Sequence, residues 1–147
     1  MSIPQAPRTT GTLMLQVLGR VAPCPRCAHQ MLWVLALLPV ARPRPGEFVK
    51  VDQEGALALA EEILRGADQD IVARRLQPRP SGSRGASFNP NTCTGCGAQA
   101  DWHDFDAVVD ASIYHGQVEV ARGRVGVRDW RRAVAAQHTV ICWLPER

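Results

Sequence analysis

The chain has 147 residues, of which 46% are hydrophobic and 21% are charged. This length and composition are typical of one domain with its own hydrophobic core, which excludes an intrinsically disordered protein. The net charge is +3, but every one of the 17 basic residues except Lys50 is arginine. This one-sided usage indicates compositional bias, so the arginine count alone is no evidence for nucleic-acid binding.

Residues 1–11 are polar and rich in Pro, Thr and Gly, so we expect a loose tail there. They lack the charged and apolar regions of a secretory signal. The strongest apolar run, residues 31–40, has about half the length needed to cross a bilayer. We therefore expect a cytoplasmic protein without membrane contact, in which the five cysteines do not form a disulfide framework.

The first half of the chain contains three candidate strands. Residues 12–18 have apolar side chains on both faces, and residues 31–40 are predicted to form a buried strand, although their periodicity does not exclude a helix. Prolines between residues 39 and 45 predict a turn, and residues 47–51 are a third candidate strand.

A helix is expected next, over about residues 53–65, with Asp52 as its cap and Gly66 at its end. Its apolar positions recur on one face, which predicts that this face packs on the core; they are Leu57, Ala60, Ile63 and Leu64. Proline, glycine and serine then mark a flexible loop at residues 77–91.

The last third of the chain is less regular. We expect residues 101–106 to be extended or turn-like, and those that follow, up to residue 114, to form a strand or a short helix. Residues 116–127 alternate in polarity and predict a pair of strands around Gly123. A short helix at 128–137 and a final strand at 139–144 complete the prediction.

Two CxxC pairs carry the chemistry of the sequence. Cys24 and Cys27 have the same spacing as Cys93 and Cys96, and together they supply four thiolates, the tetrahedral ligand set of a structural zinc site. Because four sulfur atoms fill the coordination shell, neither His29 nor a later histidine is needed as a ligand.

The residues between and after the cysteines suit tight turns. Gly95 and Gly97 relieve backbone restrictions in the second pair, and Pro25 fixes one φ angle in the first pair. The pairs are separated by residues 28–92, far more than the roughly 15 to 20 residues of a compact site. Such a gap is tolerated when the insertion folds on its own, because the entropy of loop closure grows slowly with length.

Each CxxC pair with its flanking residues is called a knuckle below, the first around Cys24 and Cys27 and the second around Cys93 and Cys96. The two knuckles resemble those of zinc-ribbon proteins. The second knuckle is similar to that of a group of uncharacterised bacterial zinc-ribbon proteins with an Asn-Thr-Cys-x-x-Cys-Gly-Ala knuckle, followed by a Gln and an aromatic strand. The matching residues are Asn91, Thr92, Cys93, Cys96, Gly97, Ala98, Gln99 and Trp102. The first knuckle departs at Pro25, where an aromatic residue is common, and at Ala28, where glycine is usual. The resemblance implies a zinc-binding ribbon and indicates no activity.

Other interpretations of the cysteines remain open. A strand followed by Cys-Pro-Arg-Cys also resembles the start of a glutaredoxin-like redox domain, although this would leave the second CxxC pair unexplained. Cys142, within the apolar segment 139–144, is expected to be a core residue and not a ligand.

The acidic segment 101–110 offers an alternative function. Carboxylates and imidazole can hold a divalent ion that activates water, as in a metal-dependent hydrolase or nuclease; the candidates here are Asp101, His103, Asp104, Asp106 and Asp110. We prefer a solvated segment, and we assign no catalytic residue.

Arginines in the predicted loop next to the second knuckle suit contact with nucleic acid, with Trp102 and Trp130 available for stacking. The candidates for this contact are Arg74, Arg75, Arg79 and Arg84. A second basic block, residues 122–132, could instead pair with the acidic blocks of the chain. We therefore expect nucleic acid or a protein as the partner, and no small-molecule substrate.

Together these features predict a single α+β domain and a non-enzymatic binding module with one structural Zn²⁺. A β-rich zinc ribbon would contain a helix-bearing insertion between its knuckles and continue into a C-terminal α/β extension. The expected parts are the tail at 1–11, the ribbon halves at 12–40 and 86–105, the insertion at 41–85 and the extension at 106–147.

Overall fold

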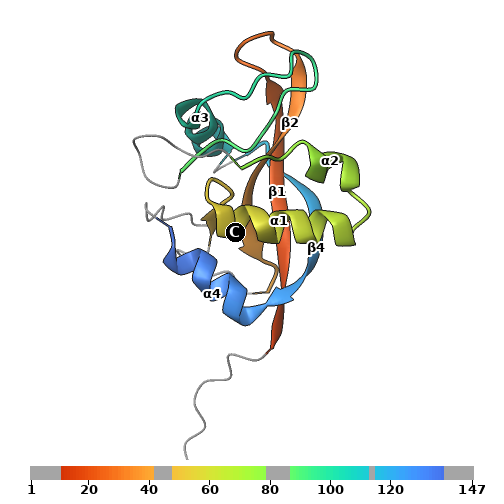
Figure 1. The fold of residues 1–147 in the computed structure, drawn as a ribbon, viewed down its shortest axis with the longest axis vertical. Coiled ribbons are helices and arrows are strands. Elements are labelled where there is room, and N and C mark those ends of the chain that lie inside the picture. The colour runs from red at the N-terminus through yellow and green to blue at the C-terminus, as the bar shows by residue number, and fades with distance from the viewer. Residues whose placement is uncertain (1–10, 42–47, 79–86, 113–114, 138–147) are drawn as a thin grey trace, which may run out of the picture.

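The computed structural model describes residues 11–41, 48–78, 87–112 and 115–137, and these form an antiparallel sheet with helices on both of its faces (Figure 1). The fold class is therefore α+β, as predicted. The strands follow the order β3-β2-β1-β4 across the sheet. In chain order the elements are β1 (Thr12–Pro23), β2 (Gln30–Pro39), β3 (Val49–Lys50), α1 (Glu54–Gly66), α2 (Asp70–Arg74), α3 (Trp102–Ser112), β4 (Val118–Gly126) and α4 (Val127–Ala135).

Strands β1 and β2 form a long hairpin at the centre of the sheet. The predicted strand at 12–18 continues to Pro23, and the apolar run at 31–40 is a strand, which settles the open choice between strand and helix. The register shifts between Leu18 and Gly19. A Cβ atom on Gly19 would lie 2.6 Å from the Trp33 carbonyl oxygen, so this close approach of two strands requires glycine.

Strands β3 and β4 flank this hairpin. The short β3 pairs with β2, which confirms a strand in the predicted third segment. The prediction of two strands around Gly123 was wrong, because β4 is one strand that pairs with β1. Gly123 lies in the middle of it, where a Cβ atom would come within 3.2 Å of the Ile63 side chain of α1. The glycine thus permits helix–sheet packing rather than a turn.

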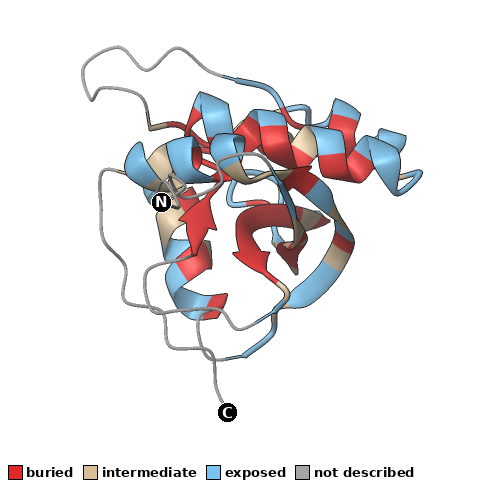
Figure 2. Cartoon of the chain, turned by 90° about the horizontal axis from the view of Figure 1, so that it is seen from below, coloured by how far each residue is buried: buried red, intermediate tan, exposed pale blue. Residues whose placement is uncertain are grey.

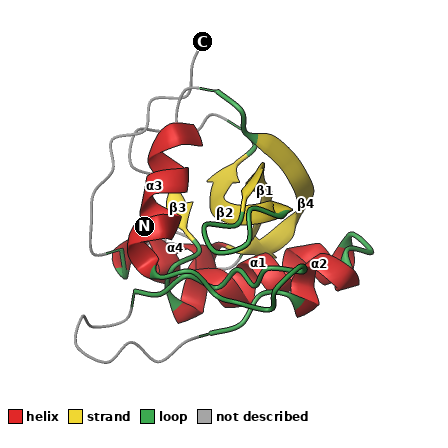
Figure 3. Ribbon diagram, turned by 90° about the horizontal axis from the view of Figure 1, so that it is seen from above, coloured by secondary structure: helices red, strands yellow, loops and turns green. Residues whose placement is uncertain are grey.

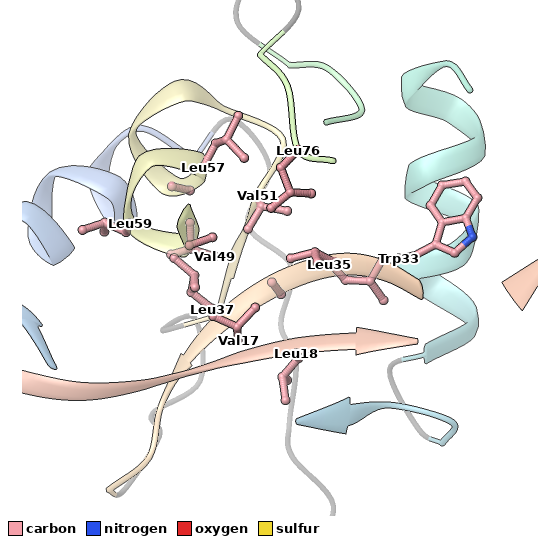
Figure 4. Packing of buried hydrophobic residues seen from close by; sticks show 14 of the residues in the cluster. Val17, Leu18, Trp33, Leu35, Leu37, Val49, Val51, Leu57, Leu59 and Leu76 are labelled. Atoms are coloured by element: carbon pink, nitrogen blue, oxygen red, sulfur yellow. The ribbon is translucent and has the colours of Figure 1, made fainter. Parts of the chain in front are cut away.

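Helix α1 covers one face of the sheet near β4, as its apolar positions predict. Its buried positions are red in Figure 2, and Leu57 and Leu59 belong to the same buried cluster as Leu37 and Val49 of the sheet, which Figure 4 draws as sticks. The expected cap was wrong. Gln53 occupies the N-cap position without a side-chain cap, and the Asp52 carboxylate instead accepts a hydrogen bond from Trp102 Nε1 at 2.8 Å.

Helix α3 corrects the prediction of an extended segment at 101–106. The Asp101 carboxylate accepts a hydrogen bond from the Asp104 backbone N–H at 2.9 Å, which caps the first turn. This N–H bond also lowers the pKa of Asp101. Phe105 and Val109 bury the inner side of the helix. At the other end, Arg20 of β1 donates a hydrogen bond to the Ala111 carbonyl at 2.8 Å.

The C-terminal part of the chain is described as far as residue 137. Helix α4 confirms the short helix expected at 128–137. The predicted strand at 139–144 and Cys142 lie outside the described residues. No helix in the described part of the chain is long and apolar enough to span a membrane. Figure 3 shows α1 and α2 along one side of the curved sheet and α3 standing beside β3.

The two knuckles have different supports. The first lies in the β1–β2 turn, as in a ribbon hairpin. The second lies in the segment 87–101, which contains no strand and forms a single β-bridge, between Asn91 and Leu76. Only one knuckle therefore projects from a hairpin, while the other is held by an irregular segment that runs from α2 toward α3.

Candidate metal centre

The first knuckle is a tight turn at the tip of the β1–β2 hairpin. The Ala28 backbone N–H donates to the Cys24 carbonyl at 2.9 Å, and the Cys24 N–H donates to the His29 carbonyl at 2.8 Å. The Arg26 N–H points at Cys24 Sγ from 3.4 Å. To close this turn, Ala28 adopts a φ of 62°, in the left-handed region that disfavours residues with a Cβ atom.

The second knuckle repeats this arrangement. The Gly97 N–H donates to the Cys93 carbonyl at 2.9 Å, and the Cys93 N–H donates to the Ala98 carbonyl at 2.9 Å. The Gly95 N–H lies 3.3 Å from Cys93 Sγ. Gly97 has a φ of 72° and occupies the position equivalent to Ala28. The predicted turn role of Gly97 is thus confirmed, and both knuckles share one backbone design.

Two buried asparagines position the second knuckle. The Asn91 side chain accepts a hydrogen bond from the Val34 N–H at 2.8 Å and donates one to the Val34 carbonyl at 3.0 Å. The Asn91 amide group therefore makes the two hydrogen bonds that the backbone of a neighbouring strand would make with Val34 of β2. Asn89 accepts a hydrogen bond from the Asn91 N–H at 3.0 Å and donates one to the Ala100 carbonyl at 3.0 Å. These bonds fix the segment on both sides of Cys93.

The knuckles also contact each other directly. His29 Nε2 and Thr94 Oγ1 lie 3.1 Å apart, within hydrogen-bonding distance. A Cβ atom on Gly95 would lie 2.9 Å from the His29 side chain, so this close approach requires glycine. Gly95 does not have the positive φ angle of Gly97, so the predicted turn role does not account for it. His29 therefore joins the two knuckles at the surface, and its ring nitrogen is engaged outside the sulfur cluster.

The four cysteines of the two knuckles meet. Their sulfur atoms all lie within 4.8 Å of one another, and Cys24 and Cys93 are buried while Cys27 and Cys96 are exposed. The Cys27–Cys93 and Cys24–Cys96 sulfur distances are 3.6 and 3.9 Å. A tetrahedron with metal–sulfur bonds of about 2.3 Å has edges of about 3.8 Å. The ligand set is therefore spaced to hold one metal ion.

The backbone already favours charge on one of these sulfurs. The Cys96 N–H, with that of Gly95, lowers the pKa of Cys93 to about 6. The His29 N–H acts in the same direction on Cys27, but partial desolvation of the sulfur and its contacts with the three neighbouring thiols outweigh it and raise the pKa of Cys27 to about 12. A cluster of four sulfurs without a cation thus resists further negative charge, which a bound dication would compensate.

The acidic segment 101–110 does not form a comparable site. Asp101 caps α3, and the Asp106 carboxylate accepts a hydrogen bond from Lys50 Nζ at 3.0 Å. The His103 ring stacks edge-on against Trp102. Within the described residues, the four cysteines are the one group of three or more His, Cys, Asp or Glu side chains that could hold a metal.

The predicted arginine surface is described only in part. Arg74 and Arg75, at the end of α2, are both exposed, whereas Arg79 and Arg84 lie outside the described residues. In the second basic block, Arg122 forms an exposed ion pair with Glu119 at 2.7 Å. This is one pairing between the second basic block and the acidic block that precedes it, of the kind the sequence allowed.

Lys50 has a role that the sequence analysis missed. It is only 2% exposed and forms ion pairs with Asp106 at 3.0 Å and with Asp52 at 3.5 Å. Its ammonium group also lies 5.1 Å from the centre of the Trp102 ring. The signal was present, since the only lysine of the chain stands within an apolar strand and two residues before an aspartate.

Comparisons with known proteins give no relative: no family model, no curated protein and no solved structure matches this chain.

Proposed function

We propose that the chain is a non-enzymatic domain in which Cys24, Cys27, Cys93 and Cys96 bind one structural Zn²⁺. The observation that carries this proposal is the approach of four sulfur atoms to within 4.8 Å, from two knuckles of the same backbone design. Thiolates are soft ligands, and a tetrahedral set of four is typical of structural zinc. Four protein ligands leave no position for a catalytic water.

The metal would add a link between two parts of the fold, beyond the hydrogen bonds that Asn91 makes with Val34 of β2. One is the free tip of the β1–β2 hairpin, and the other is the irregular segment 87–101. Between the knuckles themselves, the described residues contribute the His29–Thr94 contact. Zinc bound here would therefore stabilise the folded state directly, because the unfolded chain does not present the four ligands together.

Metal analysis tests this proposal. Protein purified without added metal is expected to contain about one zinc per chain, and Cys93→Ser is expected to reduce that content strongly. Cys142→Ser is the matched control and should leave the zinc content unchanged. Iron in place of zinc would contradict the assignment of the metal but not that of the ligands. A metal-free protein with four reactive thiols and unchanged stability would reject the site.

A binding role is the second part of the proposal, with nucleic acid ahead of a protein as the partner. It is supported by the exposure of Arg74 and Arg75 at the end of α2. Binding through phosphate contacts weakens steeply as salt rises, because counterions are released. Arg74→Glu with Arg75→Glu should then weaken binding to single-stranded DNA or RNA, whereas the exposed Arg65→Glu on α1 is the control. No binding even at low salt would rule out nucleic acid.

A further inference from the structure

The sulfur cluster has a second possible bonding pattern that involves no metal. Two of its sulfur–sulfur contacts join one knuckle to the other: Cys27 to Cys93 at 3.6 Å, and Cys24 to Cys96 at 3.9 Å. Each of these contacts pairs one exposed thiol with one buried thiol. An oxidant therefore has access to one member of each pair, and the partner sulfur is already in place.

We propose that peroxide converts the site into two disulfides that cross between the knuckles, Cys27–Cys93 and Cys24–Cys96, and thereby releases the metal. This inference rests on the proposed zinc site for its metal-release step, whereas the pairing of the sulfurs rests on the distances alone. Oxidation then replaces the metal with two disulfides as the link between the hairpin tip and the segment 87–101.

The chemistry balances with hydrogen peroxide as the oxidant. In the zinc-loaded site Cys27 is a thiolate, because a cysteine must lose its proton to bind the metal. This exposed thiolate attacks one peroxide oxygen, the O–O bond breaks, and a sulfenic acid forms as hydroxide leaves. The Cys93 thiolate attacks the sulfenic sulfur, which forms the S–S bond and expels a second hydroxide. Two electrons pass from the sulfurs to the peroxide. Cys96 and Cys24 react in the same way, and the metal leaves as the free dication once its thiolate ligands are lost.

Crossed disulfides have a structural consequence that disulfides within each knuckle lack. A bond between Cys24 and Cys27, or between Cys93 and Cys96, closes only a short local turn and does not hold the knuckles together. The crossed bonds close long loops and restrict the unfolded chain far more. The oxidised protein should consequently keep its fold without metal, whereas removal of the metal by a chelator under reducing conditions should lower the thermal midpoint.

Peptide mapping by mass spectrometry tests the pairing. Zinc-loaded Cys142→Ser protein, with the unchanged chain beside it, is treated with two equivalents of hydrogen peroxide, and zinc release is followed with a coloured chelator. We expect Cys27–Cys93 and Cys24–Cys96 linkages, loss of nearly all the zinc, and a higher thermal midpoint than that of reduced, chelator-treated protein. Linkages within each knuckle, linkages between chains, or sulfinic acids without disulfides would overturn the inference.

The two proposals fail in different ways. If the protein binds zinc but peroxide yields only Cys24–Cys27 and Cys93–Cys96 bonds, the metal site stands and the crossed pairing is wrong. If the purified protein contains no zinc but gives the crossed disulfides, the pairing stands and the zinc proposal is wrong. The metal content before oxidation and the peptide map after it are thus independent readouts.

Discussion

The side chain of Asn91 pairs with both backbone polar groups of Val34, accepting from its N–H at 2.8 Å and donating to its carbonyl at 3.0 Å. Val34 lies beyond the end of the β2–β3 pairing, because β3 pairs with Ala36 and Leu37 of β2. A single side chain thus completes the hydrogen bonding of the central hairpin and anchors the knuckle that begins two residues later.

Asn91→Ala should lower both stability and metal affinity. Val34 is fully buried, so the substitution leaves a buried N–H and a buried carbonyl without their partner. We expect a loss of about 2–4 kcal/mol in the free energy of unfolding, measured by urea denaturation of the metal-loaded protein. Gln77→Ala, which removes an exposed amide, is the control. Equal stability of the two variants would show that the Asn91 amide does not anchor the segment.

The equivalent positions Ala28 and Gly97 predict opposite effects of exchanging alanine and glycine. Both have positive φ angles, 62° and 72°. Ala28→Gly should stabilise the protein by about 0.5–1 kcal/mol, because glycine accepts this conformation without strain. Gly97→Ala should destabilise it by about 1 kcal/mol through the backbone alone, since a Cβ atom there meets nothing within 4 Å. The thermal midpoints of both variants test these opposite signs. A lower midpoint for Ala28→Gly than for the unchanged chain would contradict the prediction.

Lys50→Met should be among the more destabilising substitutions. It leaves Asp52, which is 6% exposed, without its cationic partner, and an uncompensated buried charge costs about 3–5 kcal/mol. The exposed Glu119–Arg122 pair gives the contrast, because Arg122→Met should cost less than about 1 kcal/mol. Chemical denaturation of the two variants compares them directly. Similar losses of unfolding free energy in the two variants would mean that the Lys50 ion pairs contribute no more than an exposed pair.

The Asp101 cap of α3 predicts an acid-dependent loss of stability. The folded-state pKa of Asp101 lies below its ordinary value of 3.8, because the Asp104 N–H bonds to the carboxylate. The stabilisation is therefore present above the unfolded-state pKa and is lost as the pH falls through the lower, folded-state pKa. Asp101→Asn should retain the cap without this pH dependence, and Asp101→Ala should lose the cap at every pH. Unfolding curves from neutral to acidic pH distinguish the three proteins.

Sequence patterns located the elements that depend on local signals. The apolar run of β2 and the helices α1 and α4 were predicted because their periodicity is read within one segment. The first part of α3 was predicted to be extended, and the part after residue 106 was left open between a strand and a short helix, although the signals of this helix were local as well. Trp102, Phe105 and Val109 recur at helical spacing, and Asp101 stands three residues before Asp104. The density of charge in this segment suggested a solvated turn and masked that pattern.

Features that depend on distant contacts were beyond sequence reasoning. The cysteine cluster could be predicted because two identical spacings indicate one ligand set, whatever path the chain takes between them. No comparable pattern links Asn91 to Val34 or Lys50 to Asp106, which are brought together only by the tertiary fold. Gly123 was misassigned because a glycine between alternating segments predicts a turn or a close approach equally well, and only its contact with Ile63 decides.

X-ray absorption at the metal edge, on protein purified without added metal, tests the central claim most directly. A zinc edge with four sulfur neighbours at about 2.3 Å and no nitrogen or oxygen neighbour is the predicted result. Cys96→Ser should replace one of these sulfur neighbours or abolish the signal. The absence of bound metal, or a first shell of nitrogen and oxygen atoms, would contradict the account.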